Sequence, residues 1–269
     1  MHALKSLLLA SCCLLAPLSP AEEVTKLAAP MDIPLMQNET ASAGIDQQYT
    51  GPWEFFVGGG LAVLDCNQDR MPDVFIAGGE QPAKLYRNAS KTGEALVFKP
   101  QPLTLEDNDL KQVTGAYPLD IDNDGFQDLV VLKVGRNLLL KGGADCSFTK
   151  ANKLWNYEGG NAWTTAFAAT FEKGQTYPTL AFGNYVDRSA PGSPWGTCHE
   201  NDLFRPSSKA QADYHERTAL APGFCALSML FTDWNKSGEP ALRITNDRQY
   251  YREGEEQLWR IPADNPPKL

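Results

Sequence analysis

The residues best placed to do chemistry form one acidic stretch near the middle of the chain. Four aspartates occupy positions one, three, five and nine of a loop, namely Asp120, Asp122, Asp124 and Asp128. Carboxylates at alternate positions can point into one concave turn, and Gly125 at position six lets the chain reverse by taking a positive φ. Hard oxygen ligands in this number suit Ca²⁺ better than a transition metal. The alternative is a solvated acidic turn that holds no ion.

The flanks of this loop exclude an EF-hand. An EF-hand needs a bidentate Glu at position twelve and a helix on each side, whereas position twelve here is Val131. Residues 116–119 and 129–132 are short runs of apolar residues, several of them branched or aromatic, which is typical of strands. The sequence therefore predicts a Ca²⁺ loop that joins two β-strands, with Phe126 at position seven as a further ligand.

Three other stretches repeat this order of strand, turn and strand. The four units contain residues 61–88, 116–141, 166–205 and 228–260, and each ends in a strand with leucine and a bulky apolar residue, often followed by arginine. A period of about 50 to 60 residues is typical of a propeller blade of about four strands. No segment has the sustained 3.6-residue periodicity that a helical repeat requires.

The other three loops differ from the Asp120 loop in their ligands. The first keeps Asp65, Asn67, Asp69 and Asp73, with Met71 able to offer a carbonyl, but it has Arg70 where glycine is expected. The fourth keeps Asp233, Asn235 and Ser237, with Glu239 at position seven, and has Ala241 in place of the last aspartate. Fewer charged ligands weaken Ca²⁺ binding, so a plain turn is the alternative there. The third has Lys173 at a ligand position, and we expect no ion in it.

Composition and net charge indicate which classes of function the chain can have. The chain has 269 residues, 42% of them hydrophobic, and a net charge of −9. This composition is ordinary for a folded protein, and the negative charge makes nucleic acid an improbable partner.

The N-terminus has the features of a secretory signal over residues 1–21. Lys5 supplies the positive start, residues 7–17 form an apolar run too short to span a bilayer, and small residues precede a cleavage point after Ala21. A lipoprotein signal with Cys12 as the acylated residue is the alternative. We expect a secreted or periplasmic protein with no membrane span, an extended lead-in over 22–55 and propeller blades over 56–269.

Four cysteines remain after this signal: Cys66, Cys146, Cys198 and Cys225. An even number in an exported chain suggests two disulfides. Three pairings are possible, and Cys198–Cys225 with Cys66–Cys146 is favoured because the first pair brackets one long loop segment. Buried free thiols are the alternative. The spacing does not fit a zinc site.

At these residues the chain resembles the FG-GAP/VCBS repeat proteins, whose blades build the integrin α-subunit propeller. Within them it is most similar to the cartilage-acidic-protein group, which carries such repeats before an ASPIC/UnbV module. The resemblance lies in residues 56–60, 85–88, 120–129, 225–231 and 244–248. It implies an all-β propeller with Ca²⁺ in each intact strand-to-strand loop.

Relatives usually have about seven blades, whereas about four are visible here, without an ASPIC/UnbV module. We therefore expect an incomplete or open propeller whose inner strands near Phe56 and Leu258 leave apolar faces exposed. Such a chain would self-associate or need a partner chain to complete the ring. The alternative is a small ring that the four units close by themselves.

The function expected is non-enzymatic binding or adhesion, with a protein or glycan as ligand. The alternative is a propeller-based carbohydrate-active enzyme or a lectin, because fold does not fix function. After the signal the histidines are His199 and His215, and Cys198-His199-Glu200 is better explained as a disulfide cysteine beside surface polar residues. Trp163, Trp195 and Tyr250 could stack on sugar but more often pack in a core.

Overall fold

The computed structural model describes residues 35–190, 197–247, 254–263 and 265–269. Two compact units divide the chain, Met1–Gln37 and Asn38–Leu269, and the strands described below belong to the second. The predicted signal with Cys12, and the residues Trp195 and Tyr250, lie outside the described residues.

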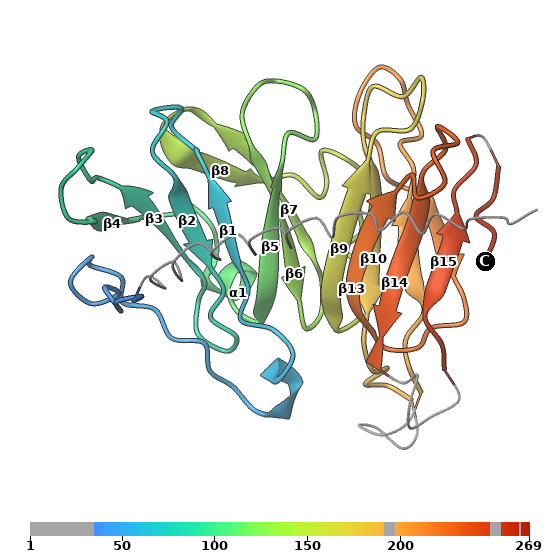
Figure 1. Ribbon diagram of the computed structural model, residues 1–269, viewed down its shortest axis with the longest axis horizontal. Coiled ribbons are helices and arrows are strands. Elements are labelled where there is room, and N and C mark those ends of the chain that lie inside the picture. The colour runs from blue at the N-terminus through green and yellow to red at the C-terminus, as the bar shows by residue number, and fades with distance from the viewer. Residues whose placement is uncertain (1–34, 191–196, 248–253, 264) are drawn as a thin grey trace, which may run out of the picture. The chain divides into compact units, whose positions relative to one another are not determined.

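The second unit is built from four antiparallel sheets in chain order (Figure 1). The first contains β1 (Leu61–Leu64), β2 (Asp73–Ile76), β3 (Lys84–Asn88) and β4 (Phe98–Gln101), and the second contains β5 (Val113–Leu119), β6 (Asp128–Lys133), β7 (Leu138–Gly143) and β8 (Ser147–Lys150). The third contains β9 (Thr164–Thr170), β10 (Thr179–Asn184), β11 (Asn201–Phe204) and β12 (Arg217–Leu220), and the fourth contains β13 (Ala226–Thr232), β14 (Ala241–Asn246) and β15 (Gln257–Arg260). The helical elements include α1 (Asp107–Leu110) and the single turns η1 (Trp53–Phe55) and η2 (Ala144–Cys146).

This architecture confirms the predicted fold class: an all-β, incomplete β-propeller with four blades, each sheet being one blade. The first strand of each blade lies beside the first strand of the next, in the order β1, β5, β9 and β13. Hydrogen bonds link these strands, from the Gly60 amide to the Thr114 carbonyl (3.1 Å) and from the Thr165 hydroxyl to the Ala226 carbonyl (2.6 Å). A Cβ on Gly60 would lie 3.2 Å from the Gly115 Cα, so glycine allows this close approach.

Each pair of neighbouring blades encloses an apolar cluster. Phe75 and Leu85 of blade one pack with Leu129 and Leu140 of blade two, and similar clusters join blades two and three and blades three and four. Every residue of β6 is buried, as expected for a strand covered on both faces. The hydrophobic burial that stabilises the blades therefore lies between them.

The two terminal blades keep exposed apolar side chains. Leu61 on β1 is 56% exposed and Leu230 on β13 is 61% exposed. Extended packing between β13 and β1 is absent from the described chain. Phe56 is exposed as expected, but Leu258 lies on β15, the third strand of its blade, and not on an inner strand. The predicted repeat is correct for the blade but wrong for the position of Leu258 within it.

The described part of the lead-in contacts the first blade. The Gln47 side chain donates to the carbonyls of Ala77 (3.3 Å) and Pro82 (3.0 Å), and the Tyr86 hydroxyl donates to the Asp46 carbonyl (2.7 Å). Isolated backbone bridging at Thr50 and Gly79 continues this contact.

Both favoured disulfides are present. Cys66 is bonded to Cys146 and Cys198 to Cys225, so the predicted pairing is confirmed. The described residues include no helix long and apolar enough to cross a bilayer.

Candidate metal sites

Three of the four loops between the first and second strands fold around their first aspartate in the same way. The Asp120 carboxylate accepts backbone N–H bonds from position five, Asp124 (3.2 Å), and position six, Gly125 (3.0 Å). The equivalent bonds run from Asp69 and Arg70 to Asp65 (3.0 and 2.9 Å) and from Ser237 and Gly238 to Asp233 (2.8 and 2.9 Å). This wrapping brings side chains at positions one, three and five round one concave turn.

Two left-handed residues shape each of these loops. Position four is Gln68 (φ 58°), Asn123 (59°) or Lys236 (55°), and position six is Arg70 (68°), Gly125 (89°) or Gly238 (80°). Arg70 therefore adopts the conformation that glycine adopts in the other two loops. The missing glycine does not change the turn, although a side chain with positive φ is strained.

The Asp120 loop gathers the densest set of carboxylates. Oxygen atoms of Asp120, Asp122 and Asp124 lie within 4.8 Å of one another. Like charges at this spacing repel unless a cation compensates them. The Asp122 Oδ1 atom is buried without a hydrogen-bond partner. An orphaned carboxylate oxygen within a group of hard oxygen donors fits a bound Ca²⁺.

The structure does not bring the position-nine aspartate into this group. Asp128 is fully buried, and its oxygens accept the amides of Ile121 (2.7 Å) and Gly142 (2.8 Å). Burial raises its pKa to about 7, against the lowering effect of these two amide bonds. Asp128 therefore clamps the start of the loop to the third strand of its own blade.

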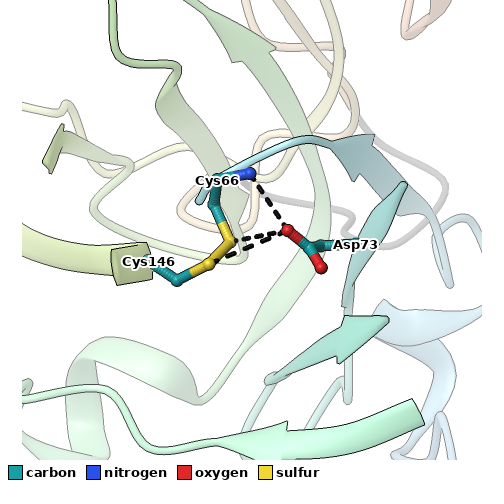
Figure 2. Close-up of side chains that lie close together, drawn as sticks. All are labelled: Cys66, Asp73 and Cys146. Carbon is teal, nitrogen blue, oxygen red and sulfur yellow. Dashed lines mark hydrogen bonds between the residues drawn. A yellow bond between two sulfur atoms is a disulfide. The ribbon is translucent and has the colours of Figure 1, made fainter. Parts of the chain in front are cut away.

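Asp73 performs the same role in blade one (Figure 2). Its carboxylate accepts the amides of Cys66 (3.0 Å) and Asn88 (2.8 Å), which are the equivalent positions. Figure 2 shows the Cys66–Cys146 disulfide beside this carboxylate, with the Cys66 Sγ 3.0 Å from Oδ2. Because both sulfurs are in the disulfide, this buried trio is not a thiolate metal site.

The remaining ligands of the first loop lie close to one another. The Asn67 amide donates to Asp69 Oδ2 (2.7 Å), while Asn67 Oδ1 is buried and has no partner. Met71 donates its amide to Asp69 (2.8 Å), as Phe126 does to Asp124 (2.9 Å) in blade two. The first loop thus repeats the geometry of the Asp120 loop with one carboxylate replaced by an amide.

The fourth loop is the most exposed of the three. The Ser237 amide also lies 3.3 Å from Asn235 Oδ1, and the Glu239 amide donates to the Ser237 hydroxyl (3.2 Å). Ala241 at position nine is buried and has no carboxylate to clamp the loop. Asp233, Asn235 and Ser237 are therefore arranged like the other ligand sets but with less support.

The third loop has an ion pair that the sequence analysis missed. Glu172 at position two is buried and accepts hydrogen bonds from Arg205 Nε and from the Thr179 hydroxyl, both at 2.7 Å. Lys173, the residue taken to occupy a ligand position, is exposed. In the sequence, the basic residue at the end of each unit is the feature that could have predicted this ion pair.

A basic side chain also enters the Asp120 loop. The ammonium group of Lys141, on β7, contacts both Asp122 Oδ2 and Asp124 Oδ2. Burial alone would lower the pKa of Lys141, but the two carboxylates outweigh it and raise this pKa. For Asp124, the Lys141 ammonium and the Phe126 amide outweigh burial and lower the carboxyl pKa.

Neighbouring loops touch one another. The Gln68 side chain of the first loop donates to the Gly125 carbonyl of the second (2.8 Å). The Asn123 side chain of the second donates to the Thr176 carbonyl of the third (2.7 Å). The candidate sites of blades one and two therefore belong to one connected edge of the propeller.

The residues considered for catalysis or sugar stacking differ in their exposure and in their neighbours. His215 is exposed beside Asp213 (2.8 Å), whereas His199 is half-buried and adjacent to the Cys198 disulfide. Trp163 is 1% exposed and packs edge-on against Trp53 and Tyr185, so its ring offers no face to a surface sugar.

Comparison with known proteins supports the repeat assignment. A family described as FG-GAP-like repeat matches residues 65–131, which include the first two candidate loops. No curated protein matches the chain. The family match and the four antiparallel blades together support an FG-GAP repeat protein.

Proposed function

We propose that the chain is an exported, Ca²⁺-binding propeller that binds a protein or a glycan and catalyses no reaction. The observation that carries the proposal is the repeated loop geometry, in which three strand connections wrap identically around their first aspartate. The FG-GAP-like repeat match over two of these loops supports it.

The residues that would hold Ca²⁺ follow from the loop positions. They are Asp120, Asp122, Asp124 and the Phe126 carbonyl in blade two, Asp65, Asn67, Asp69 and the Met71 carbonyl in blade one, and Asp233, Asn235, Ser237 and the Glu239 carbonyl in blade four. A bound Ca²⁺ would neutralise the gathered carboxylates and fix the turn. Asp73 and Asp128 hold the loops in place from behind through backbone amides.

Export is supported by the disulfides. Two bridges between segments 80 and 27 residues apart are expected in an oxidising compartment. Together with the predicted N-terminal signal, the bridges support export to the periplasm or the medium.

Binding would use the loops or the uncovered faces of the terminal blades. Loops at the edges of a rigid sheet scaffold are where binding residues gather. The exposed Leu61 and Leu230 favour either self-association or a partner chain that completes the ring.

A direct test combines binding and turnover. The purified chain is applied to a glycan array with Ca²⁺ and with chelator, and is incubated with labelled polysaccharides. Ca²⁺-dependent binding without turnover is the expected result for a glycan ligand. Polysaccharide cleavage that a His199→Ala variant loses would contradict the non-enzymatic assignment.

One feature favours the lectin or enzyme alternative. A cavity of about 450 Å³ is lined by polar groups of Asn161, Asp187, Ser189 and His199, beside Trp163. The buried Trp163 Nε1 has no hydrogen-bond partner. Such a donor beside convergent polar groups suits a small hydroxylated ligand.

A further inference from the structure

A basic residue stands opposite position nine of the metal loop in every blade. The ladder pairs Ala241 with Arg260 in blade four, and continuing the printed registers by one residue places Lys141 opposite Asp128. The same step places Arg87 opposite Asp73 and Arg205 opposite Thr179. The third strand thus carries a cation beside each loop, and the blades use it differently.

In blade three the cation is fixed. Arg205 is bonded to the buried Glu172, and its other nitrogens donate to the carbonyls of Asn265 (2.5 Å) and Pro262 (2.9 Å). A planar guanidinium held at three points has little freedom to leave. This loop therefore carries its own permanent counter-charge in place of a metal.

In blade two the cation is held, among the residues that the structure describes, by two candidate ligands. The Lys141 ammonium contacts Asp122 and Asp124, and its side chain keeps 27% of its surface exposed. A lysine is a compact charge on a flexible stem, so it can withdraw towards solvent without breaking a buried pair. In blade one Arg87 makes no ion pair with any residue that the structure describes.

We propose that Lys141 is an internal counter-cation of the Asp120 loop, which Ca²⁺ must displace in order to bind. The inference rests on the proposed Ca²⁺ site. The repelling carboxylates of Asp120, Asp122 and Asp124 need a positive charge, and the lysine supplies it when no metal is present. Lys141 thereby sets the Ca²⁺ concentration at which the loop fills, and it keeps the loop folded below that concentration.

The test measures Ca²⁺ affinity in solution by isothermal titration calorimetry. Lys141→Met is compared with the wild-type chain, and Asp124→Ala versions of both are titrated so that binding at the other loops can be subtracted. Two carboxylate contacts of a partly exposed lysine correspond to about tenfold in affinity. We therefore expect Lys141→Met to bind Ca²⁺ in the Asp120 loop about tenfold more tightly and to melt earlier than the wild type in chelator.

Two further variants make the outcome decisive. Arg87→Met removes the equivalent residue of blade one and should leave the affinity of the Asp120 loop unchanged. Lys141→Gln keeps a polar side chain without charge, and replaces Lys141→Met if that variant does not fold in chelator. Equal affinity of wild type and both Lys141 variants at a functioning site overturns the inference alone. Absence of Asp124-dependent binding in all of them overturns the proposed Ca²⁺ site as well.

Discussion

At the scale of single residues, the conformation of position six decides how easily each loop forms. Gly125 has φ 89°, and a Cβ built there would meet nothing within 4 Å. Arg70 occupies the same position in the first loop with φ 68°. A side chain at position 125 would therefore be strained by the backbone conformation and not by a steric clash.

Alanine substitutions at position six of the two loops test this explanation. Gly125→Ala should lower the free energy of unfolding by about 1 kcal/mol, because an alanine is strained at positive φ although space is free. Arg70→Ala, the matched change, should alter it by less than about 0.5 kcal/mol, because the first loop already contains this strain. Urea denaturation in chelator measures both, and equal losses for the two variants would refute the explanation.

The ligand positions were predictable from the sequence, whereas the counter-cation was not. Alternate aspartates within nine residues place Asp120, Asp122 and Asp124 on one turn whatever the rest of the fold does. Lys141 follows Asp124 by 17 residues and reaches it only through the register of β6 and β7. The turn of Asp128 towards backbone amides likewise depends on Gly142 of β7.

At the scale of elements, the disulfides join pieces that the strands leave separate. Cys66 lies in the loop after β1, and Cys146 lies in η2 between β7 and β8, so this bridge ties blade one to blade two. Cys198 and Cys225 join the segment before β11 to the start of β13, which ties blade three to blade four. Each bridge crosses a blade boundary that apolar packing and a strand-to-strand hydrogen bond also hold together.

The two bridges should differ in their effect on stability. The Cys66–Cys146 bridge closes a separation of 80 residues and Cys198–Cys225 one of 27. On chain entropy alone, removal should cost about 4.5 and about 3.5 kcal/mol. Paired Cys→Ala variants unfolded in urea would measure both, and a greater loss for the shorter bridge would show that entropy is not the controlling factor.

The apolar runs in the sequence predicted the buried strands and their turns, but they did not predict the outer strands. β6 and β10 are buried throughout, which gives the strong apolar pattern that predicts a strand. β4 and β8 lie at the outer edge and expose residues on both faces, so their sequences carry no alternation. Their pairing is set by the hairpin from the preceding strand.

At the scale of the whole molecule, the uncovered blade faces are the main feature. On blade four, the register places Leu230 beside Arg243 and Arg243 beside Leu258 across the three strands. Both leucines are exposed, as are Leu61 and Val63 on blade one. Where two blades are neighbours, the corresponding faces pack against each other.

We therefore predict that the mature chain self-associates, or requires a partner chain, at these faces. Light scattering should report a mass above that of one chain, and Leu230→Asp should shift the population towards the monomer. Leu154→Asp is the matched control, because Leu154 is as exposed but lies in the turn after β8. A wild-type chain that remains a compact monomer at high concentration would favour a self-contained four-bladed ring.

The most direct measurement of the central claim is scanning calorimetry with Ca²⁺ and with chelator. An ion that binds only the native state raises the melting temperature as its concentration rises. We predict such a rise for the wild type, a smaller one for Asp124→Ala, which abolishes the Asp120 site, and an unchanged response for Lys173→Ala in the third loop. A melting temperature that is the same in Ca²⁺ and in chelator, with no ion bound in the Asp120 loop, would contradict the account.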